Sequence, residues 1–192
     1  MTDEYQMLTG KLQISFKKMV QNEDEGHCWK NIPLAKEAFA MMKELPDTLA
    51  EEFETPADKA GILSKMLHQL YETNTPRFSL EVRRHIQQLN PDDKENLKGL
   101  EKLEDFLNLD FPMEDYCKKY NVHLYFDPVE RTEEWESVVY DMEKALDRKF
   151  RFTRRHMGFC FRYWSAKKGL LKEKYNIDWS TPSQMNPNVI FD

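Results

Sequence analysis

The sequence predicts a mainly α fold, a multi-helix bundle, and leaves open one small β element around residues 122–126. Over most of the chain, apolar residues recur three and four positions apart, the spacing that places them on one face of a helix. Thr-Pro and Asn-Pro pairs mark helix starts, because Thr or Asn caps the first amides and Pro at the next position loses no hydrogen bond. These pairs are Thr55-Pro56, Thr75-Pro76, Asn90-Pro91, Thr181-Pro182 and Asn186-Pro187.

Amphipathic stretches follow one another along the chain. After Pro56, for example, apolar residues at positions 60, 63, 66, 67, 70 and 71 keep helical spacing. Residues 8–19 fit a helix, although positions 12, 14 and 16 also alternate as in a strand. The other predicted helices start at Pro33, cover residues 79–89, start at Pro91 and Thr132, and run from about Thr153 to Tyr175.

The segment from Val122 to Phe126 departs from this helical pattern. It is short, β-branched and aromatic, and it ends at Asp127-Pro128, which together favour a strand. Residues 188–191 have a similar composition. A small sheet beside the helices, and hence an α+β fold, is therefore the minor alternative.

Charge divides the chain into two unequal parts. Residues 1–143 contain 17 Lys+Arg and 30 Asp+Glu, whereas residues 144–192 contain 11 and 4, within a net charge of −6. We expect a single globular domain over residues 1–192, long enough to bury a proper core. Its acidic helical part covers residues 1–143, and a basic-aromatic C-terminal helix with a docked tail covers residues 144–192.

The basic helix concentrates cations on a narrow stripe. On a helix, more than half of its circumference is apolar, so we expect it at the centre of the core. Small residues, Gly158, Ser165 and Gly169, form a groove along the stripe that a partner backbone can approach. The predicted anion-binding residues are Arg151, Arg154, Arg155, Arg162, Lys168 and Lys172.

The start of this helix contains an electrostatic conflict. Arg154 and Arg155 in a first turn after Thr153 oppose the helix dipole, which favours negative charge at that end. A bound anion resolves the conflict, because helix N-termini bind anions and Arg supplies paired donors. A helix that begins earlier, continuous with the Thr132 helix, resolves it equally well.

These features predict a non-enzymatic intracellular binding protein that recognises an anionic partner. The partner is either an acidic protein surface or a nucleic acid, since basic residues interleaved with aromatic ones are typical of contacts with nucleic acid. The alternative is a structural or regulatory subunit, in which carboxylates of the same chain neutralise the basic helix.

A second alternative is catalytic. Arg151 and His156 have the Arg-x4-His spacing and resemble the motif of HEPN-type ribonucleases, which are helical bundles. That family usually has a polar residue after the Arg, where this chain has Phe152. The resemblance implies that Arg151 stabilises charge and His156 moves a proton, both from one helix, during cleavage of an RNA phosphodiester.

Other chemistry finds little support in the sequence. No His or Cys lies near enough to His27-Cys28 for zinc-ligand spacing, and the glycines are too isolated for a phosphate-binding loop. We therefore expect neither a metal nor a cofactor. No apolar stretch approaches the roughly 20 residues of a membrane span, so no membrane contact is expected. An odd number of cysteines and a first segment without a secretory-signal pattern predict a cytoplasmic location.

Overall fold

The computed structural model of the protein describes residues 3–45 and 56–191. It confirms the mainly α fold: helices make up 74% of it, and no strand occurs among the described residues. The chain forms two compact units, Met1–Glu104 and Asp105–Asp192. The change from acidic to basic composition at residue 144 falls inside the second unit, so charge and compactness divide the chain at different places.

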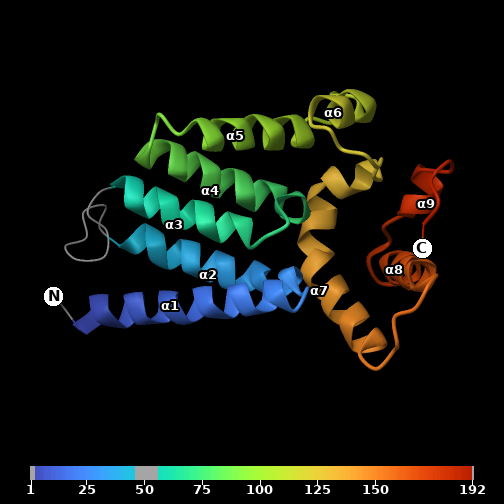
Figure 1. Ribbon diagram of the computed structural model, residues 1–192, viewed down its shortest axis with the longest axis horizontal. Helices are drawn as coiled ribbons and strands as arrows, with labels where there is room; N and C mark the ends of the chain where they lie inside the picture. Colours follow the sequence, from blue (N-terminus) through green and yellow to red (C-terminus); the bar gives the residue numbers. More distant parts are fainter. Residues whose placement is uncertain (1–2, 46–55, 192) are drawn as a thin grey trace. The chain divides into compact units, whose positions relative to one another are not determined.

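The first unit consists of helices that pack on one another in chain order. In Figure 1, α1 to α4 lie side by side and run alternately in opposite directions, and neighbouring helices pack together from α1 to α4. Its elements are α1 (Asp3–Asp24), the 3-10 turn η1 (Cys28–Lys30), α2 (Asn31–Glu44), α3 (Pro56–His68), η2 (Glu72–Asn74), α4 (Pro76–Leu89) and α5 (Lys94–Leu107), which continues into the second unit.

The apolar stripes predicted from sequence form the core of this unit. Phe39 and Met42 of α2 and Leu63 and Met66 of α3 are all buried. Tyr71 departs from its predicted place, since 65% of its surface is exposed. The reason is that α3 ends at His68, so the helical spacing that aligns position 71 with the core no longer applies.

Buried polar groups in the first unit have internal partners. Asn31 is fully buried, and its Nδ2 donates to the carbonyls of Met19 and Gln69, each at 2.9 Å. Arg83 makes a bidentate pair with Glu72, with two N···O distances of 2.6 Å. These bonds compensate the cost of removing polar groups from water.

The predicted helix starts agree with the structure at two of the Pro pairs. Thr181 forms a capping box with Gln184, and its hydroxyl accepts the N3 amide. Pro76 opens α4 as predicted, although the Thr75 side chain donates to no first-turn carbonyl and accepts from no first-turn amide. Thr55 lies outside the described residues.

At two other pairs the prediction is wrong. After Asn90-Pro91, α5 begins only at Lys94, and the Asp93 carboxylate accepts the amides of Glu95 and Asn96 at 3.0 and 2.9 Å. Asp93 thus takes the capping role expected of Asn90, because a side-chain oxygen one residue before the helix reaches its free amides. After Asn186-Pro187 a turn follows instead of a helix.

The second unit combines shorter elements around an aromatic core. Phe106, Tyr116 and Phe126 pack with ring centroids 5.2 to 6.0 Å apart, and Trp135 and Trp179 stack at 6.1 Å. Its elements are the end of α5, α6 (Met113–Lys119), η3 (Pro128–Arg131), α7 (Glu133–Phe150), α8 (Phe159–Tyr175) and α9 (Pro182–Met185).

The β element predicted around residues 122–126 is wrong: this segment is irregular. Phe126 packs on the aromatic core, as a strand residue would. The backbone of Tyr125, however, bonds to a side chain, because its N–H donates to Asn186 Oδ1 at 2.9 Å and its carbonyl accepts from Asn186 Nδ2 at 2.8 Å. One amide side chain satisfies the groups that a neighbouring strand would otherwise pair.

The basic helix is shorter than predicted. It begins at Phe159 and is separated from α7 by residues 151–158, so it is neither continuous with the Thr132 helix nor helical from Thr153. Gly158 has φ of +79°, a left-handed conformation that interrupts a right-handed helix. Arg154 and Arg155 therefore lie outside the first turn, and their conflict with the dipole is absent.

The central position predicted for this helix is also wrong. Within α8, only Leu171 is fully buried, and Phe161 is 47% exposed. Aromatic residues that a helix wheel assigns to the core are half-buried instead. α8 packs on α7 and is also contacted by the C-terminal segment, through Trp164 with Phe191 and Lys168 with Gln184.

Candidate functional site

The α7–α8 hairpin positions the candidate site. Thr132 caps α7, since its hydroxyl accepts the Trp135 amide at 3.3 Å, and α7 then continues to Phe150. At the far end of α8, Asn176 is left-handed with φ of +54°, and the Ile177 amide donates to the Leu171 carbonyl at 3.1 Å. This closure of the last turn is a Schellman-type end, which fixes where α8 stops.

An aromatic cluster ties the two helices together near the loop that joins them. The ring centroids of Phe150 and Phe159 are 5.3 Å apart, and that of Tyr163 lies 5.9 Å from Phe150. The Tyr163 hydroxyl donates to Glu143 of α7, and burial is the main cause that raises the pKa of this tyrosine. The hairpin ends are thus held by packing and by a hydrogen bond.

Lys167 belongs to the interior of this unit. Its Nζ lies 4.8 Å from the Trp135 ring centroid, 5.0 Å from that of Trp179 and 3.4 Å from a Glu143 oxygen. Trp179 in turn donates its indole N–H to Glu130 at 2.7 Å. Burial raises the pKa of Glu130 above its ordinary value. The contacts of Lys167 with two rings and a carboxylate therefore help to hold this unit together, and Lys167 is not a candidate for binding a partner.

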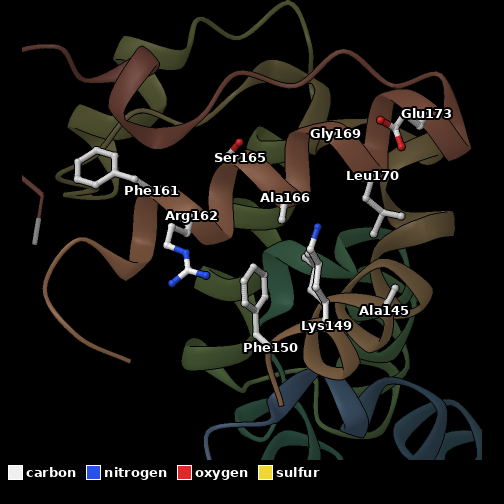
Figure 2. Close-up of a pocket in the computed structure, with 11 residues that line it drawn as sticks. Ala145, Lys149, Phe150, Phe161, Arg162, Ser165, Ala166, Gly169, Leu170 and Glu173 are labelled. Carbon is white, nitrogen blue, oxygen red and sulfur yellow. The ribbon is translucent and has the colours of Figure 1, made fainter. Parts of the chain in front are cut away.

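A pocket of about 710 Å³ lies between α7 and α8 (Figure 2). Ser165 and Gly169 of the predicted groove line it, whereas Gly158 does not. A Cβ at Gly169 would meet no other atom within 4 Å, so the space beside this glycine is open. The full lining is Ala145, Leu146, Lys149, Phe150, Phe161, Arg162, Ser165, Ala166, Gly169, Leu170 and Glu173. We call it the α7–α8 pocket.

Two cations line the α7–α8 pocket from opposite helices. Figure 2 shows Arg162 extending from α8 and Lys149 extending from α7 into the space between the helices, beside the Phe150 ring. Neither forms an ion pair with any carboxylate in the described part of the chain. Glu173 is three helical turns from Arg162, about 16 Å along α8, so the pocket is cationic at one end and acidic at the other.

The loop of residues 151–158 presents three further arginines to solvent. Arg151, Arg154 and Arg155 are all exposed, and none pairs with a carboxylate among residues 3–45 and 56–191. In the same loop, Phe152 is 94% exposed and Met157 is 82% exposed. Large apolar side chains that stand this far into water beside guanidinium groups are typical of surfaces that bind a partner.

The remaining two predicted residues have partners within the unit. Lys168 Nζ donates to Gln184 Oε1 at 2.9 Å, and Lys172 Nζ lies 2.8 Å from Asp178 Oδ2. Both contacts hold the C-terminal segment against α8. The structure therefore separates the predicted set into four arginines that pair with no carboxylate of the described residues and two lysines with internal partners.

The residues of the catalytic alternative share one loop. Arg151 and His156 both lie between α7 and α8, so they do not project from a single helix as the ribonuclease resemblance implies. His156 Nδ1 lies 2.8 Å from the carbonyl of Met157. The spacing that suggested the motif therefore does not produce its helical geometry.

Sequence reasoning missed the contribution of α7 to the pocket. Lys149 and Ala145 lie on the helix predicted to start at Thr132, but the sequence pattern identified only the apolar core face of that helix and assigned these two residues no role. One signal could have indicated this face: residues 148–172 contain nine Lys+Arg and no Asp or Glu, and this run begins on α7. The spacing of residues along the sequence does not show that this basic run is divided between two separate helices.

The described residues were also compared with the requirements for a membrane span and for a metal site. No helix in that part of the chain has the length and apolar character to cross a membrane. Nor do three or more His, Cys, Asp or Glu side chains there gather in a way that would hold a metal ion.

The chain matches no protein family, no curated protein and no solved structure.

Proposed function

We propose that this protein is a non-enzymatic binding protein that recognises an anionic partner through Arg151, Arg154, Arg155 and Arg162. The observation that carries the proposal is that these four arginines are exposed and pair with none of the carboxylates that the structure describes, in a chain with 34 Asp+Glu. Arginine binds carboxylate or phosphate through two parallel hydrogen bonds, so unpaired guanidinium groups suit either anion.

The surroundings of the four arginines support the same function. The 151–158 loop is anchored at both ends by the aromatic cluster, so its cations are presented on a fixed base. Exposed Phe152 and Met157 add apolar area beside the charges. Partner binding through such a surface combines buried apolar anchors with charge pairing at the rim.

Internal neutralisation accounts for a different part of the basic segment. Lys172 pairs with Asp178 of the same unit, as the structural-subunit alternative requires, whereas Lys168 donates to the uncharged amide oxygen of Gln184. This observation limits the binding proposal to the arginines and removes the two lysines from it.

We also place the protein inside the cell. Its three cysteines, Cys28, Cys117 and Cys160, are all free thiols. Free cysteines are typical of reducing compartments such as the cytoplasm.

The test compares two variants with the same change of four charges. R151Q/R154Q/R155Q/R162Q removes the candidate arginines, and K11Q/K17Q/K18Q/K98Q removes four exposed lysines of the first unit. Fluorescence anisotropy measures binding to a poly-glutamate peptide and to a single-stranded oligouridylate at low salt. We expect the arginine variant to bind at least one probe about tenfold more weakly and the lysine variant to bind as the wild type does.

Two results would overturn the proposal. One is that the wild-type protein binds neither probe at low salt. The other is an equal loss in both variants, because binding would then follow overall charge instead of these four arginines. Circular dichroism of both variants verifies that the helices are retained.

A further inference from the structure

The α7–α8 pocket combines an apolar interior with a cationic end. Leu146, Phe150 and Leu170 contribute apolar surface, and the lining also includes Ala145 and Ala166. Arg162 and Lys149 supply the positive charge. Its volume of about 710 Å³ falls within the range of pockets that bury a ligand of substantial size. A ligand that fills it needs an apolar group and an anionic group next to each other.

The charge of the pocket and of the unit argues against a nucleic acid in this position. Glu173 at the other end of the pocket would repel negative charge there, so a phosphate chain that runs the length of the pocket is disfavoured, whereas carboxylates held near Arg162 and Lys149 are not. The second unit as a whole has 14 Lys+Arg and 15 Asp+Glu, so it lacks the strongly basic character of nucleic-acid-binding domains. Recognition at this pocket therefore depends on short-range contacts.

Phe161 and Arg162 define how a partner would enter. Phe161 lines the pocket and is 47% exposed, so it offers apolar surface at the mouth. Arg162 is the next residue on α8, and Figure 2 shows its guanidinium group extending from the helix on the pocket side. An apolar side chain in the pocket thus places neighbouring acidic groups of the same partner within reach of a cation.

We propose that the α7–α8 pocket binds an acidic segment of another protein, in which a large apolar side chain is flanked by Asp or Glu. The apolar side chain fills the space beside Gly169, and the flanking carboxylates pair with Arg162 and Lys149. An amphipathic helix that lies in a groove is the recognition mode that uses such anchors. This inference rests on the proposed function, because it names the partner class for a pocket that shares Arg162 with the proposed arginine surface.

The test fills the pocket without changing its charge. G169L places a side chain in the open space beside Gly169, and leucine favours a helix over glycine, so the fold is retained. G61L is the matched control, since Gly61 of α3 also has no atom within 4 Å of a Cβ and lies outside the pocket. The probes are a helix-forming Glu/Leu peptide, the same peptide with Ser at every Leu, and a single-stranded oligouridylate.

We expect the Glu/Leu peptide to bind the wild type about tenfold more tightly than the Glu/Ser peptide, as the loss of a buried apolar anchor would give. G169L removes this preference and G61L retains it. R162Q weakens both peptides. The partner class is wrong if the Ser peptide binds equally well, if G169L leaves the preference unchanged, or if the oligouridylate binds more tightly than the Glu/Leu peptide.

The two proposals fail in different ways. If R151Q/R154Q/R155Q/R162Q weakens binding of the poly-glutamate probe but G169L changes nothing, the pocket inference is wrong and the anionic-surface function stands. If the four-arginine variant binds every anionic probe as the wild type does, the proposed function itself is wrong.

Discussion

Arg131 and Arg162 belong to the same unit and carry the same charge, but the fold uses them differently. Arg131 is 3% exposed, and its guanidinium group donates to the carbonyls of Asp105, Phe106, Asn108 and Phe111. Arg162 is exposed and pairs with no described carboxylate. The guanidinium of Arg131 is satisfied by the chain, whereas that of Arg162 is available to a partner.

This comparison shows that satisfied donors, more than charge, separate structural cations from candidate binding residues. Arg131 donates to carbonyls at and beyond the end of α5, and two of them, those of Asp105 and Phe106, belong to the last helical turn, where helical bonding leaves carbonyls without partners. Lys167 is satisfied by rings and a carboxylate. The four candidate arginines have no carboxylate or carbonyl partner among the described residues, although Arg151 and Arg155 each lie over an aromatic ring of a nearby residue.

The largest expected effect is that of Arg131→Met. The substitution removes the guanidinium donor of four backbone carbonyls, of which that of Asn108 keeps the Phe111 amide, so we expect a loss of about 3 kcal/mol in the free energy of unfolding. Urea denaturation followed by tryptophan fluorescence measures it. Arg151→Met, at an exposed position, should change the same quantity by less than about 0.5 kcal/mol. Equal losses in the two variants would contradict the distinction between them.

Lys167→Met should have a smaller effect. The variant keeps the apolar stem between Trp135 and Trp179 and removes the charge above both rings, so a loss of about 1 kcal/mol is expected. The same urea titration reports it, and the two rings are two of the four tryptophans that contribute to the fluorescence signal. Lys168→Met serves as the control, and a loss as large there would show that the ring contacts contribute little.

Glu130→Gln should alter how stability depends on pH. Because burial raises the folded-state pKa of Glu130, its contribution to stability is present below the ordinary value of 4.5 and is lost as the pH rises through the raised pKa. The variant lacks this loss, so its stability relative to the wild type should be greater at pH 7 than at pH 4. Denaturation at both pH values measures it, and a constant difference would refute the role of burial.

The smallest effect is expected for the surface pair of Lys172 and Asp178. Both side chains are exposed, 53% and 85%, so water and salt screen the pair. Lys172→Gln should lower the free energy of unfolding by less than about 0.5 kcal/mol. A larger loss that persists at high salt would mean that the lysine holds the C-terminal segment more firmly than its exposure indicates.

Sequence patterns predicted the helices well where one buried face sets the spacing. They failed where a distant side chain replaces a secondary-structure partner, as Asn186 does for the backbone of Tyr125 across 61 positions. For the site, the spacing of Arg162, Ser165 and Gly169 predicted one wall of the pocket. The wall from α7 could not be predicted, because periodicity describes one helix at a time.

The sequence by itself determined the mainly α fold, the concentration of cations after residue 144 and the small residues of the groove. These depend on local propensity, spacing and composition, which do not require knowledge of neighbours in space. Only the tertiary structure decided where the basic helix begins and which cations are satisfied. Lys168 and Lys172 meet partners 16 and 6 residues away, whereas Arg162 meets no described carboxylate, because the path of the C-terminal segment brings acceptors to the lysines alone.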